Sequence, residues 1–403
     1  MLLKLICSLF FLAICSAEKV IIIGAGAAGL ATASRLLENN ITDFRILEAE
    51  ERIGGRINSI FFGDAFIDLG AQNIHGDEGN LVYEIAKEFV NFKSEISETH
   101  VYYQGCKKHG NDLIEDYYSL DDDISYGSIM NDTFGDIFLK RYESILEKFK
   151  NDKNMLTYAE CFIRTAECIR IEDDGCFRWF QVVASPTYEV LPGSQTLSWD
   201  GLGYETILYI LLNKFPQRTD FNIDNWISFN KTVTKINIED NSVRILTQDG
   251  AEFRSDYVVF TPSLGVLKHN GHSLFEPSLS AQKMNAIETL GFDGGMKVIF
   301  HFSERWLVDG EKIYFVWSDE DKSAFKRDIH FGPRKDNDHW LSWFSNIAMA
   351  PNNPNVLIGW FVGPMVPEIE ELTDEELEIG TLYAMRRVLG KTFNVPDPIK
   401  VIQ

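Results

Sequence analysis

Basic side chains are scarce in this chain of 403 residues, which has 38 Lys and Arg against 60 Asp and Glu and a formal net charge of -22. Proteins that bind nucleic acid hold its phosphates mainly with clustered basic residues, so this composition argues against a nucleic-acid partner. A small cationic molecule would be attracted, and simple solubility explains the same acidity equally well. Internal repeats, low-complexity tracts and long Gly/Ser/Pro linkers are also missing, which favours domains that interleave along the chain.

Long apolar runs are missing as well. The run at residues 5–14 is too short to span a bilayer, so we expect no transmembrane anchor. Lys4 precedes this run and the small residues Ser16 and Ala17 follow it, which is the pattern of a cleaved signal peptide. The sequence therefore predicts a signal peptide at residues 1–17 and a secreted, extracellular protein. Three glycosylation sequons are compatible with export: Asn40, Asn131 and Asn230.

Cysteine is rare, with six residues in the whole chain. Removal of the signal peptide would leave an even number in a compartment that permits disulfides, namely Cys106, Cys161, Cys168 and Cys176. Three pairings are possible. Free buried thiols are the alternative, because a chain of this length can bury a core without disulfides. None of the spacings is typical of a zinc site, so we expect no metal.

A strand, a glycine turn and a helix follow one another close to the N-terminus. Residues 19–23 are apolar and β-branched, residues 24–29 have the sequence GAGAAG, and a helical pattern comes next. Such a turn suits a pyrophosphate: Gly24 allows the tight bend, Gly26 lets the backbone approach the phosphates, and Gly29 lets the helix pack on the strand.

A carboxylate at the end of the next strand completes this fingerprint. Residues 44–47 form a second apolar strand, and Glu48 follows Gly29 at the spacing where a carboxylate accepts hydrogen bonds from the adenosine ribose. A carboxylate there disfavours a nucleotide with a 2′-phosphate, which needs a basic partner. The sequence therefore predicts a Rossmann-like dinucleotide-binding domain.

The segment after this strand distinguishes flavin from nicotinamide enzymes. Residues 48–56, EAEERIGGR, resemble the conserved stretch of the flavin amine oxidase superfamily. The resemblance implies FAD as the cofactor, with Arg56 in contact with it. It implies further cofactor contacts in the neighbouring turns and strands, at Gly24, Gly26, Ala28, Gly29, Glu48, Ala49, Gly70, Ala71 and Val233.

Two more motifs resemble the polyamine oxidase branch of that superfamily. Residues 68–76, DLGAQNIHG, place His75 where the branch has its active-site histidine, while Asn73 stands where an aromatic residue is usual. Residues 290–298 match the segment that carries the family's active-site lysine, here Lys297. A lysine at the start of an apolar strand can be desolvated, which suits it to hold a water beside a flavin. The resemblance thus implies His75 and Lys297 as the catalytic residues.

These motifs predict an α/β fold in which a Rossmann-like FAD-binding domain is interleaved with an α+β substrate-binding domain. We expect FAD-binding segments at residues 18–95 and 198–268, and substrate-domain segments at 96–197 and 269–403. Local patterns also predict helices near 137–149 and 157–168, strands at 233–238, 243–247 and 257–260, a capped helix at 374–389, and a solvated acidic turn at 121–123.

The resemblance extends over residues 19–403, but members of the family continue further. They have a tryptophan-containing strand, a glycine-serine-tyrosine segment and a final motif that resembles FAGEAT. None of these is found in the 403 residues. We therefore expect the C-terminal FAD-binding segment to be absent and the chain to be a fragment or truncated variant of a competent enzyme.

The function that the resemblance implies is FAD-dependent oxidation of a polyamine, such as spermine, spermidine or an acetylated form. The products would be an aldehyde, a shorter amine and hydrogen peroxide, and the partners a small cationic amine and molecular oxygen. Two alternatives stay open. A secreted L-amino-acid oxidase shares the fold and needs an arginine to bind the substrate carboxylate. A non-catalytic flavin-fold protein would explain Asn73 and the missing C-terminal motifs.

Overall fold

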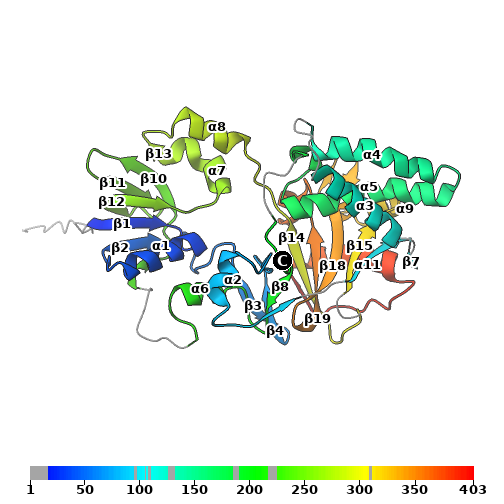
Figure 1. The fold of residues 1–403 in the computed structure, drawn as a ribbon, viewed down its shortest axis with the longest axis horizontal. Coiled ribbons are helices and arrows are strands. Elements are labelled where there is room, and N and C mark those ends of the chain that lie inside the picture. The colour runs from blue at the N-terminus through cyan, green and yellow to red at the C-terminus, as the bar shows by residue number, and fades with distance from the viewer. Residues whose placement is uncertain are drawn as a thin grey trace, which may run out of the picture. The chain divides into compact units, whose positions relative to one another are not determined.

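The computed structural model describes residues 17–94, 98–104, 106–107, 110–125, 132–184, 190–216, 225–307 and 311–403. The chain forms two units, and each is built from two separate stretches (Figure 1). The first unit consists of Met1–Ile57 and Glu205–Leu290, and the second of Asn58–Tyr204 and Gly291–Gln403. The fold is thus the interleaved α/β architecture that the sequence predicts, although the chain passes between units at other residues than the expected limits 95, 197 and 268.

The described strands of the first unit are β1 (Ala17–Ile23), β2 (Phe44–Leu47), β9 (Ile227–Ser228), β10 (Val233–Ile238), β11 (Val243–Thr247), β12 (Glu252–Phe260) and β13 (Phe275–Glu276). They form one sheet in the order β13-β10-β11-β12-β1-β2-β9. β12, β1, β2 and β9 pair in parallel, whereas β10, β11 and β12 are antiparallel. β1 is central and completely buried at Ile21 and Ile22, as is typical of a parallel strand covered on both faces.

Helices cover this sheet. They are α1 (Ala27–Glu38), α6 (Thr206–Leu211), α7 (Leu264–Leu274) and α8 (Ala281–Thr289). α1 contacts β1, β2 and α6, while α7 contacts β10, β13 and α8. Because α7 and α8 pack in this way, residues up to Leu290 stay in the first unit, beyond the expected limit at 268.

The second unit has a larger sheet, whose described strands are β6 (Glu98–Tyr103), β7 (Cys106–Lys107), β14 (Met296–His301), β15 (Glu311–Val316), β18 (Phe344–Ala350), β19 (Asn353–Phe361) and β20 (Lys400–Ile402). Their order is β20-β14-β19-β18-β15-β6-β7. β6 and β15 pair in parallel, and the other neighbours are antiparallel. This α+β sheet positions the lysine described below, because β14 lies inside it and not at its edge.

The longer helices of the second unit are α3 (Gly110–Ser125), α4 (Phe134–Lys148), α5 (Lys153–Asp174), α9 (Asp319–Asp328) and α11 (Asp374–Leu389). α3 contacts β6 and α5 contacts β15 and β18, so these helices cover the large sheet (Figure 1). The core between them contains large aromatic side chains such as Phe138, Phe162 and Trp343. Short elements complete the unit: α2 (Leu81–Ala86), α10 (Val366–Ile369), β3 (Ser59–Phe62), β4 (Ala65–Asp68), β5 (Phe92–Ser94), β8 (Leu197–Trp199), β16 (Arg334–Lys335) and β17 (Asp338–His339).

The β3–β4 hairpin explains why the first crossing between units comes as early as Ile57. The Asn353 side-chain amide donates to the Phe62 carbonyl at 2.7 Å, and β4 contacts β19. Phe62 and Ile67 are buried in one cluster with Val356 of the large sheet. These contacts attach the hairpin to the second unit, whereas the sequence analysis assigned it to the FAD-binding domain.

The prediction of a solvated turn at residues 121–123 is wrong, because these residues lie in α3. Asp121 accepts a hydrogen bond from the buried Arg170 guanidinium at 2.8 Å. This pairing offsets the cost of bringing a carboxylate to a helix packed on the core. The strands expected at 233–238 and 243–247 are confirmed, as is the capping box of α11, where Thr373 and Glu376 bond each other's backbone amides.

The structure describes only some of the residues on which the predictions for the N-terminus and the cysteines depend. β1 begins at Ala17, the last residue of the expected signal peptide, while residues 1–16 and Asn131 lie outside the described residues, as does the side chain of Cys106. Three cysteines are free thiols, namely Cys161, Cys168 and Cys176. Among the helices that the structure describes, none combines the length and the apolar character needed to cross a bilayer.

Candidate active site

The glycine turn of the first unit has the backbone that the fingerprint requires. Gly24 has a φ of +99°, a conformation that favours glycine. A Cβ on Gly29 would lie 2.0 Å from the Gly24 carbonyl oxygen, so only glycine lets α1 pack this closely on the end of β1. A Cβ on Gly26 would instead have, among the described residues, only the Gly54 carbonyl oxygen within 4 Å, at 3.8 Å. The turn therefore leaves open space where a phosphate group would approach.

The N-terminus of α1 faces this turn without a side-chain cap. Gly26 is the N-cap residue and supplies no side chain, and the first turn of the helix contains no acidic residue. The first backbone N–H groups of a helix have no partner within the helix and carry partial positive charge. An anion at this position would satisfy them, which is how helix N-termini hold pyrophosphates.

Glu48 is fixed at the end of β2 by the backbone around it. Its Oε2 accepts a hydrogen bond from the Ala25 amide at 2.6 Å, and its Oε1 accepts one from the Glu50 amide at 2.9 Å. Its side chain is 8% exposed. Each carboxylate oxygen has a second lone pair, so Glu48 can still accept hydrogen bonds from ribose hydroxyls. These residues fit the adenosine diphosphate portion of FAD.

Arg52 organises the rest of this motif, a role that the sequence analysis did not assign. Its guanidinium donates to the carbonyls of Gly55 at 2.9 Å and Ile53 at 3.2 Å. The Gly54 amide donates to the Ala25 carbonyl at 2.9 Å, which ties the motif to the glycine turn. The other expected cofactor residues of this unit are placed as follows: Arg56, Ala49 and Ala28 are exposed, and Val233 is half-buried in β10.

Lys297 is the centre of the candidate site in the second unit. It lies in β14, between β19 and β20, and its side chain is 8% exposed. Its Nζ donates to the backbone carbonyls of Asp68 at 2.7 Å and Gly70 at 2.8 Å, and to Gln72 Oε1 at 3.1 Å. Nζ also lies 5.0 Å from the centre of the Trp360 ring. Burial lowers the pKa of Lys297 to about 8, against the effect of the nearby Asp68 carboxylate.

The Asp68 carboxylate holds the turn that binds Lys297. Its Oδ1 accepts hydrogen bonds from the Ser59 hydroxyl at 2.5 Å and from the Tyr204 amide at 2.9 Å. The turn that presents the Asp68 and Gly70 carbonyls is therefore held by hydrogen bonds other than those of Lys297. The structure thus brings the two motifs at 68–76 and 290–298 together, although more than 200 residues separate them.

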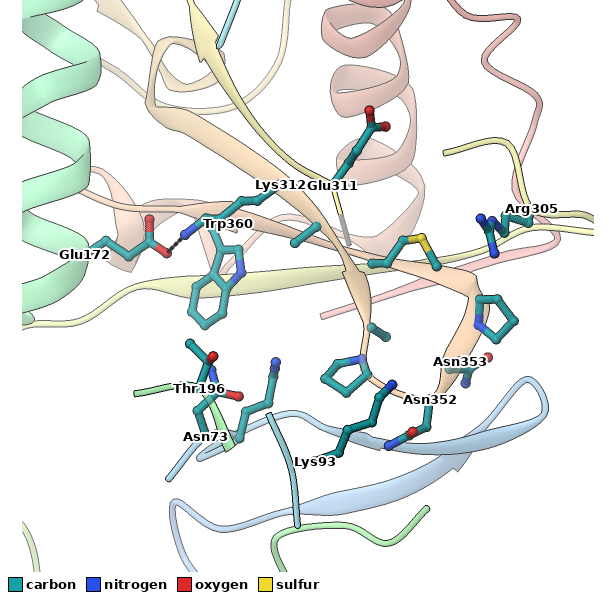
Figure 2. A pocket seen from close by; sticks show the side chains of 16 residues that line it. Asn73, Lys93, Glu172, Thr196, Arg305, Glu311, Lys312, Asn352, Asn353 and Trp360 are labelled. Atoms are coloured by element: carbon teal, nitrogen blue, oxygen red, sulfur yellow. Dashed lines mark hydrogen bonds and ion pairs between the residues drawn. The ribbon is translucent and has the colours of Figure 1, made fainter. Parts of the chain in front are cut away.

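A cavity of about 450 Å³ opens beside this cluster, and Gln72, Asn73 and Trp360 line it. Figure 2 shows the Glu172–Lys312 ion pair on one side of the Trp360 indole and Asn73 with Thr196 on the other. Glu172 and Lys312 are 3.0 Å apart. Further charged side chains in the wall are Lys93, Arg305 and Glu311. The cavity therefore offers both hydrogen-bonding groups and charges of either sign to a polar ligand.

His75 is not brought into this cavity. Its side chain is exposed, and its backbone carbonyl accepts a hydrogen bond from Asn80 at 2.9 Å. The preceding residue, Ile74, is buried and pairs with Leu197 of β8. Ala71 is exposed and Gly70 is half-buried beside Lys297. The two predicted catalytic residues thus belong to one unit. Lys297 contacts Gln72 and Trp360, which line the cavity, whereas His75 does not line it.

Three site residues were not predicted from the sequence: Gln72, Glu172 and Trp360. Gln72 could have been found from its place in the 68–76 motif, two residues after Gly70. Glu172 and Trp360 carry no local signal, because a glutamate in a helix and a tryptophan in a strand are usually surface and core residues.

The chain belongs to the family of flavin containing amine oxidoreductases, whose pattern matches residues 27–165 and 198–403. The protein is therefore an amine oxidoreductase, and its cofactor is FAD.

Known relatives place the chain within this class. It is 26% identical to Probable polyamine oxidase 5 of Arabidopsis thaliana, over 93% of this chain and 76% of the relative. It is 26% identical to the human Peroxisomal N(1)-acetyl-spermine/spermidine oxidase, over 96% of this chain and 80% of the relative. A solved structure of a putrescine oxidase with redesigned cofactor binding superposes with a TM-score of 0.58 over 96% of this chain and 84% of that one, at 13% identity. The last comparison shows a shared fold.

Proposed function

We propose that this protein oxidises a polyamine, such as spermine, spermidine or an acetylated form, and releases an aldehyde, a shorter amine and hydrogen peroxide. The observation that carries the proposal is the placement of Lys297, a buried ammonium held by the 68–72 turn next to a polar cavity. Relatives that are named polyamine oxidases support the same substrate class.

The reaction consumes one oxygen and one water for each amine. FAD, whose adenosine diphosphate portion the glycine turn, the N-terminus of α1 and Glu48 would hold, would supply the two-electron oxidation of the carbon beside the amine nitrogen, with oxygen as the final acceptor and hydrogen peroxide as its product. Water then adds to the resulting carbon–nitrogen double bond of the imine, and cleavage gives the aldehyde and the shorter amine. The amine must be neutral when it loses hydride, so the protein has to bind and orient it without trapping it as a cation.

In the proposal, the residues around the cavity have separate roles in substrate binding and imine hydrolysis. Lys297 keeps its proton at neutral pH, because its pKa of about 8 lies above 7. Its ammonium holds the water that adds to the imine. Glu172 offers a carboxylate to the remaining ammonium groups of a polyamine, and its pairing with Lys312 limits how tightly they are held. We assign no role at this cavity to His75, because its side chain is exposed and does not line it.

The test is a peroxide assay of the FAD-loaded protein with spermine, spermidine, their acetylated forms and leucine. Peroxide in equal amount to aldehyde from one of the polyamines is the expected result. Peroxide from leucine alone would establish an L-amino-acid oxidase in its place. Activity on none of the substrates, with FAD bound, would support a non-catalytic flavin protein.

The L-amino-acid oxidase is the second candidate because Arg305 lines the cavity. An arginine is the side chain best suited to bind a carboxylate through two parallel hydrogen bonds. In the structure its Nε donates to the Leu307 carbonyl at 3.0 Å. Arg305→Met should abolish oxidation of leucine if this function is correct, and should leave oxidation of polyamines within a few-fold of wild type if it is not.

We also propose that the protein is secreted and that residues 1–17 are removed. The charged start, short apolar run and small residues before Glu18 support this. Cleavage there would remove Ala17, the first residue of β1, but keep the pairs from Glu18 onward with β12. Expression in eukaryotic cells should release protein with Glu18 at its N-terminus into the medium; intact Met1 inside the cells would refute secretion.

A further inference from the structure

The ammonium of Lys297 has no hydrogen left for a ligand. A lysine ammonium has three N–H donors and no acceptor. Here the three acceptors are carbonyl oxygens of Asp68, Gly70 and Gln72, at 2.7, 2.8 and 3.1 Å. Any water or substrate that is to accept a hydrogen bond from Lys297 must therefore replace one of them.

The three acceptors differ in how easily they can be replaced. The Asp68 and Gly70 carbonyls belong to a backbone turn that is held by Ser59 and Tyr204 through the Asp68 carboxylate. The Leu69 amide between them donates to the Asn58 carbonyl at 2.9 Å. Gln72 instead contributes a side-chain oxygen at the longest of the three distances, and a side chain can change rotamer where a fixed backbone cannot.

Among the described residues, the Gln72 amide is held in place by its hydrogen bond with Lys297. Because Lys297 can only donate, Oε1 of the amide must face it, and Nε2 must point the other way. Within the part of the chain that the structure describes, Lys297 is the only hydrogen-bond partner of the Gln72 side chain. Gln72 also lines the cavity, so there is space into which its amide can turn.

We propose that Gln72 is a positioning residue that occupies the third hydrogen of the Lys297 ammonium and must turn into the cavity before Lys297 can donate to a water or ligand there. This inference rests on the proposed function, in which Lys297 holds the water that adds to the imine. The rotamer of Gln72 then determines whether Lys297 can donate a hydrogen bond to a water or ligand. The titratable group beside Lys297 is Asp68, and the charged groups that line the cavity faced by Gln72 are Lys93, Glu172, Arg305, Glu311 and Lys312.

The experiment measures the pKa of Lys297 directly, by following the NMR signal of its ¹³Cε in lysine-labelled, FAD-loaded protein as pH is changed. Lys297→Met identifies the signal. Three variants alter the proposed contact: Gln72→Leu fills the same space without an acceptor, Gln72→Glu replaces the acceptor by a carboxylate, and Gln72→Ala opens the space to water. Asn352→Asp is the matched control for charge, because Asn352 lines the same cavity as Gln72 and its φ of +57° is tolerated by Asp.

Gln72→Leu should lower the pKa of Lys297 and Gln72→Glu should raise it, each by about one unit or more, as expected for loss of an acceptor and gain of an adjacent opposite charge. Gln72→Ala should stay close to wild type, because a water takes the place of the amide. Asn352→Asp should shift the value less than Gln72→Glu does. An unchanged pKa in both Gln72→Leu and Gln72→Glu would overturn the proposal, and so would a fall in Gln72→Ala equal to that in Gln72→Leu.

These outcomes do not depend on which amine is oxidised. If the peroxide assay of wild-type protein is negative while the pKa of Lys297 follows the Gln72 variants, the proposed function fails and the contact between the two residues stands. If polyamines are oxidised but the pKa of Lys297 is the same in all Gln72 variants, the proposed function stands and the proposed role of Gln72 fails.

Discussion

The Ala25 backbone amide donates a hydrogen bond of 2.6 Å to the Glu48 carboxylate, across the ends of two neighbouring parallel strands. The glycine turn that would hold the pyrophosphate therefore also fixes the carboxylate that would hold the ribose. Both halves of this nucleotide site depend on one backbone segment, and a change to either is expected to affect FAD binding as a whole.

Glu48→Gln is expected to weaken FAD binding by about ten- to a hundredfold. Glu48 accepts from the Ala25 and Glu50 backbone N–H groups with its two oxygens, whereas a glutamine amide has only one acceptor oxygen. A hydrogen bond to a charged group contributes about 1.5–3 kcal/mol. Titration of the flavin-free protein with FAD, followed by flavin fluorescence, measures the affinity. Glu51→Gln, at an exposed position of the same segment, is the control and should bind like wild type. Equal affinity for all three proteins would contradict the assignment of Glu48.

Gly29→Ala should prevent α1 from packing on β1, because the new Cβ would lie 2.0 Å from the Gly24 carbonyl oxygen. A clash with backbone cannot be relieved by a rotamer change, so we expect a loss of stability of at least about 3 kcal/mol and loss of FAD. Thermal unfolding followed by circular dichroism is the measurement. Gly291→Ala, where a Cβ meets nothing among the described residues, should change the stability by less than about 0.5 kcal/mol.

Lys297→Met in FAD-loaded protein should slow flavin reduction or reoxidation by about a hundredfold or more, the usual contribution of a positioned acid–base group. Methionine keeps much of the length and apolar volume of the lysine and removes its donors. Stopped-flow absorbance of the flavin separates the two half-reactions. Rates equal to wild type in both would remove Lys297 from the reaction. Lys140→Met, at an exposed position of α4, serves as the control.

The stability of the protein should rise with pH where Lys297 titrates. Its pKa is about 8 in the folded chain and about 10.5 ordinarily, because burial disfavours the ammonium. Between these values the unfolded chain binds more protons than the folded one, so the free energy of unfolding increases with pH. Below pH 8 both states are protonated and the penalty is complete.

The expected size of this effect is about 3 kcal/mol, since one pKa unit corresponds to about 1.4 kcal/mol. Urea unfolding at pH 7 and pH 10.5 measures it as a difference between wild type and Lys297→Met, so that groups common to both cancel. The free energy of unfolding of wild type, minus that of Lys297→Met, should be larger at pH 10.5 than at pH 7. An equal difference at the two pH values would show that Lys297 has an ordinary pKa.

Local features of the fold could be predicted from the sequence where the signal lies within a few neighbouring residues. The glycine turn before α1, the strand that ends in Glu48 and the capping box at Thr373 each depend on contacts within a short stretch. Periodicity likewise predicted β10 and β11 to the residue.

Features that depend on distant contacts could not be predicted in this way. The β3–β4 hairpin joins the second unit because Asn353, almost 300 residues away, bonds the Phe62 carbonyl. Asp121 lies in a helix, α3, where it pairs with Arg170 of α5, a residue 49 positions away. For Lys297 the resemblance indicated a role, but its hydrogen bonds with Asp68, Gly70 and Gln72 are visible only in three dimensions.

The indole of Trp360 lies 5.0 Å from the Lys297 ammonium and also lines the cavity. An aromatic ring this close to a cation interacts with its charge. Its fluorescence should consequently differ between the charged and neutral forms of the lysine and change again when a ligand enters. Subtracting the spectrum of a Trp360→Phe variant isolates this single emitter, so the protein carries its own optical reporter of the state of Lys297.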